Sequence, residues 1–382
     1  MKQIVCLSTS PWYPIPTRKQ QVMQRLSGAE VLYFDPPVTY IAPLKDKNAR
    51  PKLRAHKNPG VQVKENITVY ALPPVLPFFN KFRWINRLNQ KRMAHYVNKK
   101  CRAHGFDAPL LWVYSPTAVD SVDKIRHSAL VYDCVDRHSA YGGLMNPALV
   151  DEMELALAAK ADQVFATANS LCRRLQAVNP KATFIPNGAN FERFVAASRP
   201  QPKPADFPAG DGPVFCFVGA LQGCIEYGFL EYAAKARPDW RFVFLGRPVA
   251  GVDLSALRQL PNCHFLGLRP NDQLPQYLAH CDVCLNLFDQ SDLSRDVSPL
   301  KFFEYLATGK PIVSTPQPEQ ILQFSADIHI ARTKEDFVSA CEEALRDTAP
   351  ARVARRIELG RQSSWDSRVA QMEAIARQEK IL

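Results

Sequence analysis

One short segment in the second half of the chain combines a proline, a lysine and a glutamate at the spacing of a helix start. In SPLKFFEYLATGKPIV (residues 298–313), Pro299 suits the first turn of a helix and Lys301 follows within that turn. Glu304 comes three residues later and therefore shares a helical face with Lys301. Because the N–H groups of a helix N-terminus and a lysine amine both attract negative charge, the segment predicts an anion site.

A second group of reactive side chains follows an apolar segment in the first half of the chain. The run LVYDCV predicts a strand over 130–135, and Asp136 and His138 come after it in a loop that continues through residues 141–143. Asp136 is the first candidate for a general base, since ligands of parallel sheets bind at the carboxyl ends of strands. Asp133 competes, although it could instead hold the loop through backbone N–H groups. His138 is a third candidate because a neutral imidazole accepts a proton near pH 7, and a reaction without a side-chain base stays open.

Positive charge is concentrated in the first quarter of the chain. Residues 1–110 contain 19 Lys and Arg against 5 Asp and Glu, whereas the remainder contains 29 against 32. Within this region the acid-free segment 80–102 mixes its cations with Phe82, Trp84 and Leu88. Such a basic amphipathic segment predicts contact with an anionic membrane surface, and a solvated helix that covers a sheet is the alternative. Nucleic acid is not an expected partner, because no recognised nucleic-acid motif accompanies the charge.

Two further cations, Arg18 and Lys19, stand at a predicted helix start after the first strand-like segment. Cations beside a helix N-terminus oppose the helix dipole, which favours an anionic partner such as a phosphate group. Plain surface charge is the alternative interpretation.

The elements that must position these residues alternate between strand-like and helix-like along almost the whole chain, which predicts an α/β fold with two Rossmann-like domains. Strands are predicted over 4–8, 31–35, 68–72, 110–114, 130–135, 163–166 and 183–186, and again over 214–219, 241–246, 264–267, 283–288, 311–315 and 328–331. The expected division is an N-terminal domain over 1–197, a proline-rich linker over 198–213, a second domain over 214–363, and a C-terminal helix over 364–382 that packs back on the first domain.

The rest of the composition predicts a cytoplasmic protein at the inner face of a membrane. No segment approaches the roughly 18 apolar residues that span a bilayer, and no signal-peptide pattern opens the sequence. The ten cysteines lie mostly in apolar segments, as reduced core thiols do. Cys281 and Cys284 have the spacing of metal ligands but sit in a strand-like run, so no metal site is predicted.

The segment 298–313 resembles the donor-binding signature of GT-B glycosyltransferases, especially the family 4 group and the teichuronic-acid-type polysaccharide transferases. The resemblance is carried, in order, by Pro299, Lys301, Glu304, Tyr305, Leu306, Gly309 and Pro311. Looser similarity extends over 129–143, 184–194, 213–246 and 261–288. It implies a GT-B fold, in which two Rossmann-like domains face each other across a cleft, with 1–197 as the acceptor domain and 214–363 as the nucleotide-sugar donor domain.

The resemblance also implies roles for individual residues. Lys301 and the helix N-terminus would bind the donor diphosphate and stabilise it as it leaves, and Glu304 would accept hydrogen bonds from the ribose hydroxyls. The other expected donor contacts are Ser298, Pro299, Leu300, Gly219, Arg247 and Leu268. Family 4 members carry a glutamate eight positions before the second carboxylate, whereas this chain has Asp296, so the donor sugar and the stereochemistry of transfer stay open.

The implied activity is transfer of a sugar from a nucleoside-diphosphate sugar, with UDP as the expected nucleotide, to a lipid-linked or cell-surface polysaccharide acceptor. In GT-B enzymes the helix and its cation replace the metal of other transferases, so we expect neither a metal nor another cofactor. Two alternatives remain: a nucleotide-sugar 2-epimerase of the same fold, and a non-catalytic, degenerate transferase that scaffolds polysaccharide assembly.

Overall fold

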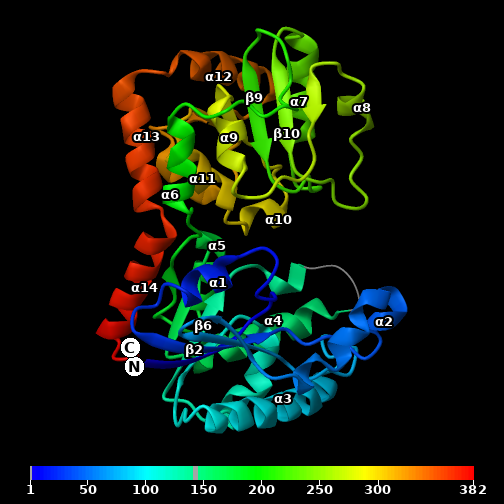
Figure 1. The fold of residues 1–382 in the computed structure, drawn as a ribbon, viewed down its shortest axis with the longest axis vertical. Coiled ribbons are helices and arrows are strands. Elements are labelled where there is room, and N and C mark those ends of the chain that lie inside the picture. Colours follow the sequence, from blue (N-terminus) through cyan, green and yellow to red (C-terminus); the bar gives the residue numbers. More distant parts are fainter. Residues whose placement is uncertain (1, 141–144) are drawn as a thin grey trace. The chain divides into compact units, whose positions relative to one another are not determined.

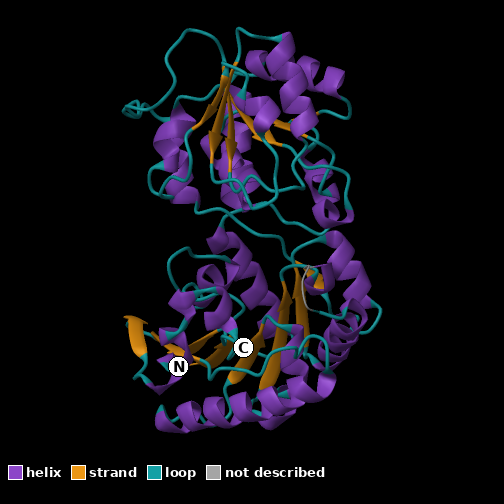
Figure 2. Cartoon of the chain, turned by 90° about the vertical axis from the view of Figure 1, so that its right-hand side faces the viewer, coloured by secondary structure: helices purple, strands orange, loops and turns teal. Residues whose placement is uncertain are grey.

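The computed structural model describes residues 2–140 and 145–382, and the chain divides into two compact units (Figure 1). Unit 1 comprises Met1–Pro186 and Val369–Leu382, and unit 2 comprises Asn187–Arg368. Each unit has its own sheet with helices on both faces (Figure 2).

The sheet of unit 1 runs in the order β3-β4-β2-β1-β5-β6-β7-β8 in the described chain. Its strands are β1 (Lys2–Leu7), β2 (Ala29–Asp35), β3 (Val61–Lys64), β4 (Ile67–Ala71), β5 (Leu110–Val113), β6 (Ala129–Cys134), β7 (Gln163–Ala166) and β8 (Thr183–Phe184). Neighbouring strands pair in parallel except β3 and β4, which are antiparallel.

Helices bury both faces of this sheet, which explains why its central strands read as almost continuous apolar runs. Val5 and Leu7 of β1 pack in one core, whereas Ile4 and Cys6 point to the other. The helices of unit 1 are α1 (Arg18–Met23), α2 (Ala42–Lys45), α3 (Arg83–Ala103), α4 (Pro147–Lys160) and α5 (Asn169–Gln176). β6 follows the same alternation, so Asp133 and Tyr132 face opposite layers.

The sheet of unit 2 is parallel throughout its described strands, in the order β11-β10-β9-β12-β13-β14. The strands are β9 (Val214–Val218), β10 (Arg241–Leu245), β11 (Cys263–Phe265), β12 (Val283–Asn286), β13 (Ile312–Ser314) and β14 (His329–Ile330). The helices are α6 (Phe191–Phe194), α7 (Tyr227–Ala236), α8 (Ser255–Arg258), α9 (Leu274–Ala279), α10 (Asp292–Arg295), α11 (Leu300–Thr308), α12 (Lys334–Arg346) and α13 (Pro350–Gln362).

The division between the units falls elsewhere than the linker expected at 198–213. Phe191 and Phe194 of α6 and Phe207 beyond it pack into the same core as Phe302 and Tyr305 of α11. The chain from Asn187 onward therefore belongs to unit 2, because burial of these aromatic side chains stabilises the fold more than an extended linker would. The proline-rich segment therefore lies on unit 2 and its ends are not the boundary.

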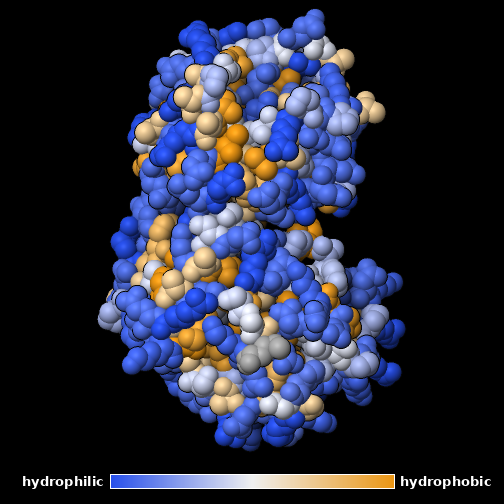
Figure 3. Space-filling view, turned by 60° about the vertical axis from the view of Figure 1, so that its left-hand side comes forward, coloured by the Kyte–Doolittle hydropathy of each residue, from blue (hydrophilic) through white to orange (hydrophobic). Residues whose placement is uncertain are grey.

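The last helix, α14 (Trp365–Gln378), starts in unit 2 and continues in unit 1. Val369 and Met372 are buried in the unit 1 core that contains Ile4. Glu373 accepts hydrogen bonds from the backbone and hydroxyl of Ser27 at 2.6 and 2.8 Å. The face that contains α13 and α14 is mostly hydrophilic, with small groups of hydrophobic residues between the hydrophilic ones (Figure 3).

Every strand predicted from the sequence is present, with ends that differ by at most two residues. β3 was not predicted, because VQVK is short, mostly exposed and polar at alternate positions, as suits a protected sheet edge. All ten cysteines are buried and free. Among the described helices, none combines the length and the apolar character needed to cross a bilayer.

Candidate functional site

The segment that carries the lysine and glutamate forms helix α11, as expected, but Pro299 precedes the helix as its N-cap residue instead of lying in its first turn. The side chain of Pro299 makes no capping hydrogen bond, and Gly309 ends the helix in the left-handed conformation at φ 72°. The Val218 N–H at the end of β9 donates to the Tyr305 hydroxyl at 2.8 Å. This bond fixes α11 against the carboxyl end of the central strand.

Lys301 lies at the start of α11 against two aromatic rings. Its Nζ atom is 3.8 Å from the centroid of the Phe217 ring and 4.7 Å from that of Phe288. Burial lowers the pKa of Lys301 to about 7, although Cys224 and Glu304 partly offset the effect. The side chain is still partly exposed, so an incoming anion can meet the amine and raise its pKa again.

Glu304 shares this partly open environment. Burial raises its pKa to about 7, against the opposing effects of Arg193 and Lys301. Near neutral pH the carboxyl can therefore accept or donate a hydrogen bond. Arg193 of α6 was not predicted as a site residue, because only the packing of α6 against α11 brings the FERF segment to Glu304.

Gly219 lies close to the Lys301 side chain, so the structure brings two predicted donor-site residues near each other. A Cβ atom on Gly219 would lie 3.9 Å from Lys301 Cδ, and the glycine has φ +129°, which disfavours other residues. Its N–H donates to the Leu245 carbonyl at 2.9 Å. The backbone of Gly219 can come this close to β10 only because residue 246 is also a glycine, since a Cβ atom there would stand 1.9 Å from the Gly219 oxygen.

Ser298 is hydrogen-bonded to a neighbouring turn in the same unit. Its hydroxyl accepts the Asn187 N–H at 3.0 Å, and its carbonyl accepts the Asn187 side-chain amide at 2.8 Å. Ser298 therefore joins the turn that contains Asn187 to the start of α11. Asp296 is buried two residues before it, and its role toward a donor sugar stays a prediction.

Arg247 and Leu268 lie on loops after β10 and β11. The Arg247 side chain is exposed, and its carbonyl accepts the Leu221 N–H at 2.9 Å. Leu268 is half exposed, and its neighbour Arg269 pairs with Asp206 and donates to the Tyr277 hydroxyl at 2.8 Å. Their contacts with a nucleotide stay predictions.

In unit 1, Arg18 and Asp133 form a buried ion pair. Arg18 Nε lies 3.0 and 2.9 Å from the two carboxylate oxygens of Asp133, and Arg18 Nη1 donates to the Pro186 carbonyl at 3.1 Å. The alternative of plain surface charge is therefore wrong for Arg18, whose side chain is buried, whereas its contact with an acceptor phosphate stays a prediction. Asp133 holds a buried cation instead of backbone N–H groups, since a carboxylate inside a strand needs an opposite charge.

Asp136, His138 and Lys19 form a group at the end of β6. Lys19 is buried, and burial lowers its pKa while Asp136 and Asp133 partly restore it. Burial likewise lowers the pKa of His138, so its ring is neutral at pH 7. The structure thus places a cation near the candidate base Asp136. Residues 141–143 of the predicted loop lie outside the described residues.

Among the described residues, no three His, Cys, Asp or Glu side chains gather as a metal site. Cys281 lies in the core of unit 2 together with Cys216 and Cys284, and burial raises its pKa. These thiols pack as apolar side chains.

Sequence comparisons agree with this geometry. A family model described as glycosyl transferase-like matches residues 227–374, which include α11 and most of unit 2. One relative is a Bacillus subtilis (strain 168) protein that is provisionally named as the teichuronic acid biosynthesis glycosyltransferase TuaH. It is 28% identical to this chain over 236 residues. That match covers 56% of this chain and 58% of the relative, so the chain is aligned with little more than half of the relative's length.

Solved structures extend the similarity to the whole chain. Sucrose-phosphate synthase from Thermosynechococcus elongatus superposes with a TM-score of 0.70 at 16% identity, covering 99% of both chains. HepE from Anabaena in complex with UDP gives a TM-score of 0.65 at 15% identity, covering 99% of this chain and 100% of that one. At these identities the structures establish the fold. The chain has the GT-B fold of two Rossmann-like units, and the predicted resemblance to GT-B glycosyltransferases is confirmed.

Proposed function

We propose that the protein transfers a sugar from a nucleoside-diphosphate sugar that binds unit 2 at the start of α11. One observation carries the proposal: Lys301 and Gly219 lie close together at a helix N-terminus that its N-cap residue Pro299 does not cap, and Glu304 follows one turn later. A helix N-terminus with a lysine stabilises a diphosphate, and a tight glycine loop lets its oxygens approach the backbone.

The shifted pKa of Lys301 suits a leaving-group stabiliser. Without a ligand, burial between Phe217 and Phe288 leaves the amine close to half protonated at pH 7. A bound diphosphate would hold the proton on Lys301, and the negative charge that grows as the glycosidic bond breaks would strengthen the interaction. Glu304, also poised near neutrality, would accept hydrogen bonds from ribose hydroxyls.

Two neighbours of the same fold support UDP as the nucleotide. The HepE structure contains UDP, and a trehalose-6-phosphate enzyme from E. coli was solved with UDP-2-fluoroglucose. The latter superposes with a TM-score of 0.70 at 12% identity over 100% of both chains. Contacts with the base would then come from the backbone of the loop that carries Leu268, and Arg247 would face the diphosphate.

In unit 1, Asp136 would act on the acceptor. It stands just beyond the carboxyl end of β6 near Lys19, at a position from which its carboxylate could take a proton from an acceptor hydroxyl. A lipid-linked or polysaccharide acceptor is supported by the name of the Bacillus relative, which refers to teichuronic acid biosynthesis.

The outer face of α3 supports binding at an anionic membrane surface. Trp84 and Leu88 lie one turn apart on this helix and are 60% and 52% exposed, and Phe82 just before it is 44% exposed. Exposed Arg87 and Lys91 flank them. Aromatic and cationic side chains on one helix face are typical of peripheral membrane helices.

The test is a panel of UDP, GDP, ADP and inorganic phosphate read by thermal unfolding, followed by incubation with the matching nucleotide sugar. The proposal expects one nucleoside diphosphate to raise Tm and sugar transfer only when an acceptor is added. Conversion of the nucleotide sugar to its epimer without an acceptor would favour an epimerase and contradict the proposal.

A further inference from the structure

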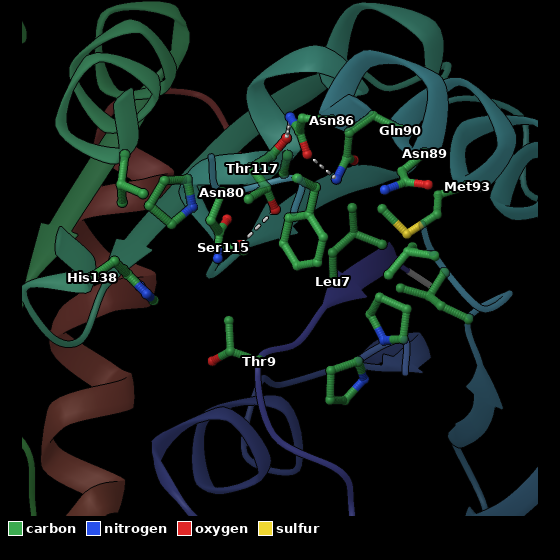
Figure 4. A pocket seen from close by; sticks show the side chains of 18 of the residues that line it. Leu7, Thr9, Asn80, Asn86, Asn89, Gln90, Met93, Ser115, Thr117 and His138 are labelled. Carbon is green, nitrogen blue, oxygen red and sulfur yellow. Dashed lines mark hydrogen bonds between the residues drawn. The ribbon is translucent and has the colours of Figure 1, made fainter. Parts of the chain in front are cut away.

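Unit 1 contains a cavity of ≈ 240 Å³ at the carboxyl ends of its strands (Figure 4). Thr9 follows β1, Ser115 follows β5 and His138 follows β6, while Gln90 reaches the cavity from α3. The volume is somewhat below the roughly 300–1,000 Å³ of common small-molecule sites. It therefore suits one small ring better than a chain of several.

The cavity is uncharged although unit 1 is strongly basic. Of the described residues that line it, none is Lys, Arg, Asp or Glu, and His138 is neutral at pH 7 because burial lowers its pKa. Leu7, Val75, Phe79 and Met93 form much of its apolar wall. A carboxylate or phosphate entering it would lose its hydration without meeting a cation.

The amide groups on α3 show which part of the wall is available to a ligand. Asn89 bonds the backbone of Leu76 through both its oxygen and its nitrogen, at 2.9 and 3.0 Å. Asn86 donates to the Thr117 carbonyl at 2.9 Å and to Asp120 at 2.7 Å.

Gln90 differs from both of these amides. It is 3% exposed, its amide nitrogen makes only a long bond of 3.4 Å to Asn86 Oδ1, and its Oε1 atom has no hydrogen-bond partner among the described residues. A buried carbonyl oxygen without a partner is costly, so Gln90 lacks a hydrogen-bond donor that a ligand would supply.

We infer that this cavity binds an uncharged pyranose ring, with a sugar hydroxyl donating to Gln90 Oε1 and the C–H face of the ring against Leu7 and Met93. A pyranose has hydroxyl groups that can donate to the polar part of the cavity wall and a C–H face that can pack against its apolar part. That this ring is the terminal sugar of the acceptor rests on the proposed function. The exclusion of charged sugars such as uronates rests on the cavity alone.

The test compares methyl glucopyranoside with methyl glucuronopyranoside, which has a carboxylate on the same ring, by ligand-observed NMR on the full chain at pH 7.5. We expect the neutral glycoside to bind at least about tenfold more tightly. Gln90→Leu keeps the size of the side chain and should weaken that binding by roughly fivefold to tenfold, whereas Gln62→Leu, on an exposed strand of the same unit, should not. If Gln90→Leu does not fold, Thr9→Val at the partly exposed edge of the cavity replaces it, and we expect a smaller loss.

Three results would overturn the inference: equal binding of the uronoside, unchanged binding in both cavity variants, or displacement of the glycoside by farnesol, which would assign the cavity to a lipid chain. If UDP still stabilises the protein when one of these results is found, only the cavity inference fails and the proposed donor site is unaffected. If the protein binds the glycoside through Gln90 but binds no nucleotide, the sugar-binding role of the cavity is supported and the proposed transferase function is contradicted.

Discussion

The amine of Lys301 lies 3.8 Å from the centroid of the Phe217 ring, a residue of the central strand of unit 2. The ring removes water from one side of the amine while its face attracts the charged form. Burial prevails, since the pKa of Lys301 falls to about 7. Free of ligand, the site thus holds a lysine close to its titration midpoint, which has measurable consequences.

UDP binding should take up protons at pH 7.5 to 8, because the diphosphate raises the pKa of a lysine that is then mostly neutral. Calorimetric enthalpies measured in Tris and in HEPES should therefore differ. Below about pH 6 Lys301 is already charged, so its contribution to the difference should fade. In Lys301→Met the difference should shrink sharply, and equal proton uptake in that variant would assign the protons to other groups.

Glu304→Gln should stabilise the unliganded protein above pH 7. The folded-state pKa of Glu304 is about 7 against an ordinary 4.5, so ionising it opposes folding above pH 7, and this cost declines between pH 7 and 4.5 and is absent below. We expect a gain of about 1 kcal/mol, or roughly 2–4 °C in Tm, at pH 8 and none at pH 4.5. Glu358→Gln on the exposed face of α13 is the control, and a loss of Tm at pH 8 in Glu304→Gln would show that the charged form is stabilised.

Gly246→Ala should damage unit 2 through the backbone. The new Cβ would overlap the Gly219 oxygen, so the loop beside Lys301 must move. We expect a loss of roughly 2 kcal/mol or more by urea unfolding and weaker UDP binding. Gly223→Ala, whose Cβ would meet nothing within 4 Å, serves as the control. Equal stability of the two variants would refute the close approach.

Asp133→Asn and Asp136→Asn should have opposite signatures. Removing the Asp133 charge leaves Arg18 buried and unpaired, which should cost about 3–5 kcal/mol of stability. Asp136→Asn, at a partly exposed position, should change stability little and reduce turnover by roughly 10²–10⁴-fold if it is the general base. Wild-type turnover in Asp136→Asn would remove this residue from the chemistry.

Replacing Trp84 and Leu88 together by serine should weaken binding to vesicles that contain anionic lipid, as measured by cosedimentation. Both side chains are exposed on α3, so Tm should stay within about 1–2 °C of the wild type. Val249→Ser, at an exposed position in unit 2, is the control. If the double variant and the wild type sediment equally, the outer face of α3 is not a membrane surface.

The sequence predicted the parallel strands and α11 because apolar runs, turns and the helix signature are local features. It could not predict what depends on partners distant in the chain. The local sequence predicts Arg18 as a surface cation beside a helix start, yet it is buried because it pairs with Asp133, 115 positions away. Arg193 becomes a neighbour of Glu304 only through the packing of α6. The cavity beside Gln90 likewise arises from side chains of several strand ends and a helix, and no single segment encodes it.

The most direct measurement of the central claim is the dissociation constant of UDP for the wild type, Lys301→Ala and Lys235→Ala, the last replacing an exposed lysine on α7. Loss of a charged hydrogen-bond donor to the diphosphate should weaken binding by roughly 10–100-fold in Lys301→Ala and leave Lys235→Ala unchanged. Equal UDP affinity in all three proteins would contradict the assignment of α11 as the donor diphosphate site.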